Sequence, residues 1–279
     1  MSTAIANSVS RFGWLVWDAV AGFGRFTEFV FAVIGQLAAH PAKCLRPSLL
    51  VAQFYAVGVA SIPVVAITGA FIGMILSLEG YAQFAAIGQE QRMGGIINVS
   101  VTKQIGPVLA AVMVAGRVGG ALAAELGSMA VTEQLDAMRA MDADPIRILV
   151  VPRVVACLVM TPMLTIYSDM LGAWGAWLVT CRVYGVSDAD YWYFTGLFVH
   201  WWDPVSGLMK SAAFGVAIGL VACFKGFHSR AGAAGVGRAA TSAFVAAFMA
   251  IIILNLVLAQ FFNTIYRLFI SQPGSYLGG

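Results

Sequence analysis

Five long apolar runs constrain this chain more than any other feature. Each has about the twenty residues that an α-helix needs to cross a bilayer. The runs are continuous, whereas membrane β-strands would alternate apolar and polar residues, so helices are the expected way to satisfy the backbone in lipid. Only 10% of the residues are charged, against about 25% in soluble domains. We therefore expect an all-α integral membrane protein with five transmembrane helices, at about residues 54–78, 105–124, 154–179, 205–224 and 241–262.

The first 46 residues differ from these runs. Charged residues such as Arg11, Asp18 and Arg25 interrupt every apolar stretch, and aromatic residues recur between them. A cleaved signal peptide would instead have an uninterrupted apolar region that ends in small residues. We therefore expect residues 1–46 to contain an amphipathic helix in the membrane interface, ended by His40-Pro41.

Basic residues are distributed unequally between the two sides of the predicted membrane. Cytoplasmic segments carry the excess of lysine and arginine in membrane proteins. The segments on the N-terminal side hold ten basic residues and the opposite segments hold four, so the N-terminus is expected in the cytoplasm and the short tail, residues 266–279, outside. The ten are Arg11, Arg25, Lys43, Arg46, Arg139, Arg147, Arg153, Lys225, Arg230 and Arg238; the four are Arg92, Lys103, Arg182 and Arg267.

A polar segment, residues 125–153, separates the second and third apolar runs. Gly127-Ser128 is expected to end the second span, and a helix is predicted over about residues 128–143, ended by Asp144-Pro145. Its acidic residues come early and its arginine late, which suits the helix dipole, and Leu135, Met138 and Met141 form a narrow apolar stripe. Two interpretations are open: a solvated loop helix, or a coupling helix that docks into a groove of an ATPase.

Three ionisable residues lie within the predicted spans, where burial of charge is costly. Arg117 is close enough to the inner end of its span to extend to the lipid headgroups. Asp169 and Lys210 differ by only about 7 Å in predicted depth, so we expect them to form a pair. The pair would either hold two spans together or contact substrate.

Span one carries two further signals. Pro63 is expected to kink it, and Gly69 and Gly73 are spaced for close helix packing. Similar glycine pairs occur at Gly116/Gly120 and Gly215/Gly219, and they would serve either packing within one chain or a dimer seam. The apolar residues around Phe71 would face lipid or line a cavity.

Several classes of function lack their sequence signals. There is no Walker A pattern, so this chain is not expected to bind ATP, and the four cysteines and three histidines are too scattered for a metal site. A net charge of +3 is too small for nucleic-acid binding. A membrane enzyme would need clustered catalytic side chains, and a self-contained secondary transporter would usually show internal repeats; the latter is kept as the alternative function.

Longer motifs resemble one family closely. They are Gly69-Ala-Phe-Ile-Gly-Met-Ile-Leu-Ser-Leu-Glu-Gly-Tyr81, the segment from Gly106-Pro-Val-Leu to Glu125-Leu-Gly127, Thr132-Glu-Gln-Leu-Asp-Ala-Met, Asp144-Pro-Ile-Arg with Pro152-Arg153, Lys225-Gly-Phe and Gly235-Val-Gly-Arg-Ala. Together they resemble the MlaE/YrbE permease family, in order, over about residues 10–265. The resemblance places a permease domain at residues 47–265.

The resemblance implies the membrane subunit of an ABC transporter that moves phospholipids or related lipids between membranes. Such a subunit would reside in the cytoplasmic (inner) membrane as a homodimer. Its partners would be a cytoplasmic ABC ATPase, which uses ATP and Mg²⁺, and a Mce-domain lipid-binding protein outside. This chain itself would bind no cofactor and would not be an enzyme.

The resemblance also implies roles for individual residues. The lipid cavity would be lined by Phe71, Ile72, Met74, Ile75, Leu78 and Tyr81, and coupling to the ATPase would fall on Glu125, Thr132, Glu133, Gln134, Asp136 and Arg139. Two positions depart from the family pattern. Gln104 replaces an acidic residue at the head of span two, and Asp142 replaces a small residue near the predicted ATPase face.

Overall fold

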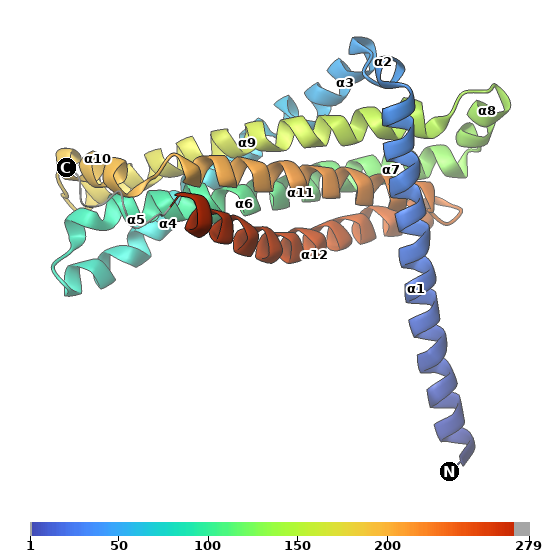
Figure 1. Cartoon of the computed structure of the whole chain (residues 1–279), viewed down its shortest axis with the longest axis horizontal. Helices are drawn as coiled ribbons and strands as arrows, with labels where there is room; N and C mark the ends of the chain where they lie inside the picture. The colour runs from blue at the N-terminus through green and yellow to red at the C-terminus, as the bar shows by residue number, and fades with distance from the viewer. Residues whose placement is uncertain (1, 271–279) are drawn as a thin grey trace.

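The computed structural model describes residues 2–270, and within this range it contains helices and short connections (Figure 1). Six helical segments are long and apolar enough to cross a membrane, so the chain is an all-helical, multi-pass membrane protein. The α-helices are α1 Ser2–Ala39, α2 Pro41–Cys44, α3 Pro47–Val57, α4 Ile62–Ala86, α5 Met93–Ser100, α6 Gly106–Val114, α7 Gly120–Val131, α8 Gln134–Ala140, α9 Val151–Trp177, α10 Asp188–Phe198, α11 Trp202–Phe227 and α12 Ala233–Ile265.

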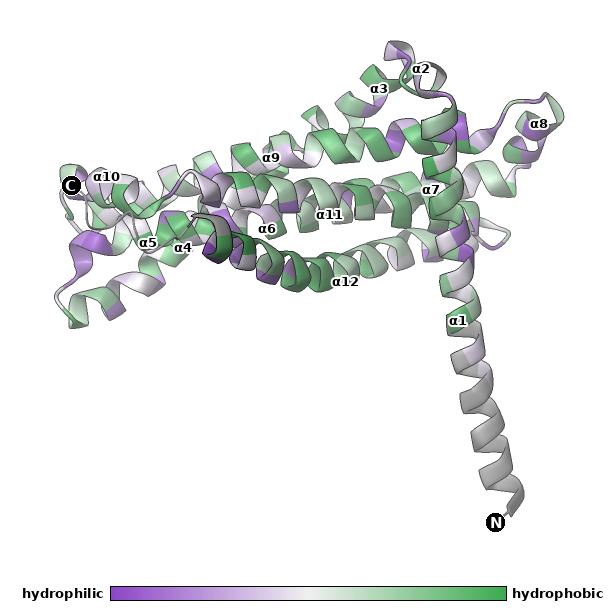
Figure 2. Cartoon of the chain, viewed as in Figure 1, coloured by the Kyte–Doolittle hydropathy of each residue, from purple (hydrophilic) through white to green (hydrophobic). Residues whose placement is uncertain are grey.

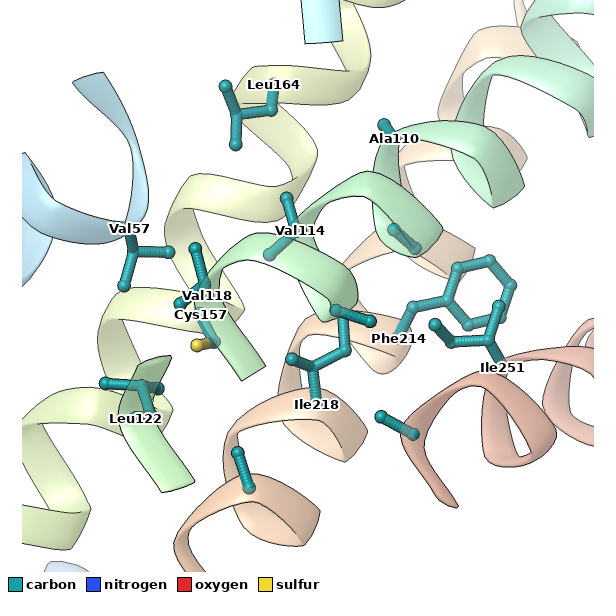
Figure 3. Packing of buried hydrophobic residues seen from close by; sticks show 14 of the residues in the cluster. Val57, Ala110, Val114, Val118, Leu122, Cys157, Leu164, Phe214, Ile218 and Ile251 are labelled. Carbon is teal, nitrogen blue, oxygen red and sulfur yellow. The ribbon is translucent and has the colours of Figure 1, made fainter. Parts of the chain in front are cut away.

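The long helices form one elongated bundle with α9 and α11 at its centre (Figure 1). α9 packs against α4 and α11, and α11 packs against α7 and α12. Figure 3 shows the core between them, where Phe214 of α11 lies beside Ile251 of α12 and near Val114 of α6. Apolar residues cover the length of the bundle, whereas hydrophilic residues gather at its two ends (Figure 2).

The first apolar run is broken where its proline predicted a kink. α3 ends at Val57, a 3₁₀ turn η1 covers Val59–Ser61, and Pro63 lies in the first turn of α4. Proline suits that position because the first amides of a helix have no intrahelical acceptor. The kink is therefore confirmed, and the helical region is longer than the predicted residues 54–78.

The second apolar run was predicted too short. Helix continues from Met93 to Val131 through α5, α6 and α7, joined by the π-helical turns η3 (Val101–Ile105) and η4 (Ala115–Gly119). The expected break at Gly127-Ser128 is wrong. Gly127 lies inside α7, where a Cβ would come within 3.2 Å of the Ser229 hydroxyl, so this glycine serves close packing and not helix termination.

The remaining spans lie where they were predicted, with longer bounds. α9 is extended by the π-helical turns η5 (Ile146–Val150) and η6 (Leu178–Val183), and α11 and α12 contain the fourth and fifth runs. The connection after η6 contains the additional helix α10. Of the expected outer tail, residues 266–270 form the turn η7 (Tyr266–Ile270), and residues 271–279 lie outside the described range.

α1 accounts for the sixth apolar segment, Val20–Ala39. It runs across one end of the bundle instead of along it (Figure 1). An interfacial helix would have this orientation, but its membrane location stays a prediction. Most side chains of residues 1–19 lie outside the described set.

Two of the glycine pairs serve packing within the chain. A Cβ at Gly69 would come within 2.6 Å of the Ser168 carbonyl oxygen of α9, and one at Gly73 would overlap the backbone of Gly172. Gly215 and Gly219 of α11 meet α9 in the same way, at Cys157 and Val154. Small residues allow backbones to approach where lipid supplies no hydrophobic force between helices.

Candidate coupling segment and transport surfaces

The short helix α8 projects from one end of the bundle, between α7 and α9 (Figure 1). Glu133 and Asp142 flank it, and they are the only non-glycine residues with positive φ in the described range, at 60° and 59°. Left-handed residues cannot continue a right-handed helix. The predicted helix over residues 128–143 is therefore wrong in its bounds: residues 128–131 belong to α7, and Glu133 precedes α8 instead of lying within it.

The polar residues predicted for coupling lie on the surface of this segment. Asp136 and Arg139 form an exposed ion pair of 2.8 Å along α8, and Gln134 is exposed at its start. The Thr132 hydroxyl donates to the Ser128 carbonyl oxygen at 2.9 Å, at the end of α7. The apolar stripe is divided: Leu135 is buried, but Met141 is 72% exposed. α8 thus presents charged residues outward, Met141 directly after it is also exposed, and Leu135 is the buried residue of the helix.

Glu125, in the second half of α7, is exposed and also forms an ion pair within the chain. Its carboxylate accepts from Nη2 of Arg153 at 2.7 Å, which joins α7 to α9. Arg153 is 2% exposed and Glu125 57%, so the pair connects the interior to the surface. Sequence reasoning missed Arg153 as a partner of Glu125. The sequence did carry a signal: Arg153 directly precedes the third apolar run and Glu125 directly follows the second, so both lie at the same end of neighbouring spans.

α1 is connected to the same region. Nε2 of Gln36 donates to Oδ2 of Asp144 at 2.6 Å, while Oδ1 of Asp144 accepts from the Ile146 backbone amide at 2.9 Å. Asp144 therefore both begins the helical segment that continues into α9 and binds α1. The two ends of the α8 segment are fixed, one by Glu125–Arg153 and the other by Gln36–Asp144.

Arg117 binds polar groups of the chain itself, and its extension to the headgroups stays a prediction. Its guanidinium donates to the Ala56 carbonyl oxygen at 3.2 Å and to the Ser61 hydroxyl at 2.8 Å. Both acceptors lie at the break between α3 and α4. The Pro63 kink leaves polar backbone groups without helical partners, and an arginine from η4 satisfies one of them.

The expected pair of Asp169 and Lys210 is absent from the structure. The Lys210 ammonium donates instead to the Lys103 carbonyl oxygen and, at 2.8 Å, to Oε1 of Gln104. Both acceptors belong to η3, where the π-helical pattern displaces carbonyls from their α-helical partners. The position at which Gln104 departs from the family pattern thus has a role in the interior, as an acceptor for Lys210.

Asp169 lies apart from this network. Its Oδ1 is buried beside Gly106 and has no hydrogen-bond partner within the described residues. Lys103, which supplies its carbonyl to Lys210, forms an ion pair of 3.4 Å with Asp203. The depth argument could not foresee that nearer polar groups would satisfy Lys210.

The residues predicted to line a lipid cavity form one apolar face of α4. Phe71 is 57% exposed, and Ile75 and Leu78 are each 47% exposed; Ile72 and Met74 are half-buried. Tyr81 stacks on Tyr184 with ring centroids 3.8 Å apart. A single chain leaves this face uncovered, so a cavity here needs a second wall from outside the chain.

Comparison with known proteins identifies the family. The family model described as Permease MlaE matches residues 50–261. A probable ABC transporter permease protein of Rickettsia felis is 39% identical over 92% of this chain and 97% of its own length. A probable ABC transporter permease protein of Synechocystis is 40% identical, over 74% and 79% respectively. The intermembrane phospholipid transport system permease protein MlaE of Haemophilus influenzae is 33% identical over 91% of this chain and 97% of its own length. The chain belongs to the MlaE permease family.

Proposed function

We propose that this chain is the membrane subunit of an ABC transporter that moves phospholipids or related lipids between membranes. A separate cytoplasmic ATPase, which binds and hydrolyses ATP with Mg²⁺, supplies the energy. The observation that carries the proposal is α8, a short helix held outside the bundle by two left-handed residues. The names of the relatives, as ABC transporter permeases and a phospholipid transport permease, support the substrate class and the ATPase.

The contacts around α8 could transmit a movement of the ATPase to the transmembrane helices. The ATPase would contact the exposed residues at this end of the bundle, Thr132, Glu133, Gln134, Asp136 and Arg139. Glu125–Arg153 ties α7 to α9 at the base of α8, so a displacement of α8 would move both helices together. α9 packs along α4, and the movement would reach the apolar face of α4.

The lipid would bind at this face of α4. In a homodimer a second copy would supply the missing wall, and the seam would accept acyl chains, whose burial is favourable by about 0.8 kcal/mol per CH₂. Closure driven by the ATPase would offset that gain and release the lipid. A Mce-domain protein would receive or deliver it at the opposite end of the bundle.

The orientation follows from charge. The end of the bundle that carries α8 also holds Arg147, Lys225, Arg230 and Arg238, which supports its assignment as the cytoplasmic end by the positive-inside rule. The chain would then reside in the inner membrane with its N-terminus in the cytoplasm.

Affinity purification in mild detergent tests the proposal. The native chain should recover an ABC ATPase and bound phospholipid, whereas Glu133→Lys/Asp136→Lys should lose the ATPase because both charges at the docking segment are reversed. Glu79→Lys/Asp190→Lys is the matched control, since it makes the same charge change at the opposite end and should retain the ATPase.

Three results would count against the proposal. ATPase recovered equally with both double variants would exclude α8 as the docking segment. Phe71→Trp/Ile75→Trp that leaves the bound phospholipid unchanged would exclude the α4 face. A native chain that transfers fluorescent phospholipid between vesicles without any ATPase would favour the alternative, a self-contained secondary transporter.

A further inference from the structure

A cavity of about 980 Å³ lies between α1, α11 and α12, at the end of the bundle that carries α8. It is separate from the apolar face of α4 and from α8. Its walls come from α1, α11, the turn after α11 and α12.

The charged residues that the structure describes on these walls have one sign. Arg25, Lys225, Arg230 and Arg238 line the cavity, and no aspartate or glutamate is among its described lining residues. Among the side chains that the structure describes, none of the four forms an ion pair or a side-chain hydrogen bond. Like charges repel when they are gathered close together. Four cations from α1, α11, the following turn and α12 therefore indicate an anion that neutralises them.

The cavity is also lined by apolar residues. Phe26 of α1 contacts Phe224 of α11 edge to face, with centroids 5.3 Å apart, and Phe23, Val221 and Ala246 continue the surface. The cavity thus combines basic and apolar lining residues, and α1 and α11 each contribute both kinds. A soluble anion would need only the basic residues.

We propose that this cavity binds an anionic phospholipid from the cytoplasmic leaflet, with the phosphate among the four cations and an acyl chain against Phe23, Phe26 and Phe224. Basic pockets between membrane helices on the cytoplasmic side are suited to anionic headgroups. The proposal rests on the orientation given under the proposed function and not on transport. The bound lipid would hold α1 against α11 and α12, and α1 in turn binds Asp144 beside α8 through Gln36.

Native mass spectrometry of the detergent-purified chain tests this site, with phosphatidylglycerol or phosphatidylcholine added at equal concentration. We expect phosphatidylglycerol to bind on the order of tenfold more tightly, and Lys225→Gln/Arg238→Gln to remove that preference. Arg46→Gln loses a cation at the same end but outside the cavity, and should keep the preference. Lys225→Arg keeps the charge and should keep it too.

A second variant tests the apolar lining without changing charge. Ala246→Phe takes up space in the cavity and should weaken the binding of phosphatidylglycerol. In a separate test on the native chain, soluble glycerol phosphate at millimolar concentration should not displace phosphatidylglycerol. Displacement of the lipid by glycerol phosphate or inorganic phosphate would show a free-phosphate site and overturn the proposal.

Two other outcomes would also overturn it. One is an unchanged preference for phosphatidylglycerol in Lys225→Gln/Arg238→Gln. The other is loss of a recovered ATPase from that variant without loss of lipid, which would make the basic cluster a protein-docking surface. If the chain binds phosphatidylglycerol in this cavity but transports no lipid, the inference of a lipid site stands and the proposed function is refuted. The two proposals can therefore fail separately.

Discussion

The central helices and the peripheral helices of this bundle differ in how much of their surface the chain itself covers. About half of the residues are buried in the apolar windows of Glu90–Val131, Ile146–Val183 and Trp202–Phe227, at 50%, 56% and 50%. In Pro47–Ala86 and Ala233–Leu268, which contain α4 and α12, the shares are 22% and 17%. The centre is therefore a packed protein interior, and the periphery is a surface that something else must cover.

The two regions also differ in residue chemistry. Glycines and polar groups hold the centre together: Gly215 and Gly219 lie between α11 and α9, and Lys210 binds the carbonyl of η3. Exposed phenylalanine, isoleucine and leucine dominate the periphery. In a bilayer, an apolar helix face gains little free energy when it exchanges contact with lipid for contact with another helix. Such a face can therefore bind and release a lipid or a second subunit with a small change in free energy. A rigid centre beside such a surface suits a transport protein.

The largest expected effect contrasts two phenylalanines. Phe214 is fully buried in the core, so Phe214→Ala should destabilise the chain by about 3–5 kcal/mol through the cavity it leaves. Phe71 is 57% exposed, so Phe71→Ala should cost within about 0.5 kcal/mol. Unfolding of the detergent-solubilised variants measures both. Equal losses would break the distinction between centre and periphery, or show that Phe71 is covered by a partner.

A second contrast lies along one helix, since α4 packs closely on α9 at Gly73 but is open two turns later on the same face, at Gly80. A Cβ at Gly73 would overlap the backbone of Gly172, so Gly73→Ala should destabilise by about 3 kcal/mol. At Gly80 the nearest atoms are 3.8 Å away, in the Phe84 ring, and Gly80→Ala should stabilise by about 0.5–1 kcal/mol through helix propensity. If the two variants change the free energy of unfolding in opposite directions, the packed centre ends on α4 between Gly73 and Gly80. If both change it in the same direction, no such boundary exists there.

A third prediction concerns the connection between the two regions at the kink. Arg117→Met removes the donor to Ala56 and Ser61 and should cost about 1–3 kcal/mol, as for hydrogen bonds to charged groups. Hydrogen exchange of the amides around residues 56–62 should accelerate, while exchange in α9 should not change. Unchanged exchange at the kink would mean that Arg117 does not support it.

The smallest expected effect lies at the end of the centre, beside α8. Asp142 has φ 59°, so Asp142→Val should cost about 1–2 kcal/mol because a β-branched residue is strained there. Asp142→Gly should stay within about 0.5 kcal/mol of the native chain. Circular dichroism during thermal unfolding compares the two. If Asp142→Val is tolerated as well as Asp142→Gly, the left-handed junction does not define α8.

Much of the fold could be predicted because the bilayer restricts the choices. Apolar runs of about twenty residues must become helices, and all five predicted runs did. Pro63 placed the kink for a local reason, since proline starts a helix more easily than it continues one. The helix boundaries were less predictable. Gly127-Ser128 suggests a break from local propensity, but burial against the residues after α11 keeps the helix intact.

The sequence predicted the kind of segment at the site, but not which side chains pair with one another. Residue pattern alone indicated a polar segment with a short helix between two spans, and motif resemblance indicated the family. Pairing required the tertiary structure. Asp169 and Lys210 were matched by depth, but Lys210 met a displaced carbonyl of η3 first. The motif indicated no partner for Glu125 within the chain, and the packing of α7 on α9 supplies Arg153.

The sequence by itself therefore determined the membrane environment, the helical class, the kink and the family, because each depends on composition or on short local patterns. Only the tertiary structure decided which charge meets which acceptor, which glycines face another backbone, and that four cations from α1, α11, the following turn and α12 surround one cavity. The physical reason is distance: hydrogen bonds and ion pairs act over a few ångströms, and only the packed helices bring residues that are far apart in the chain within that range.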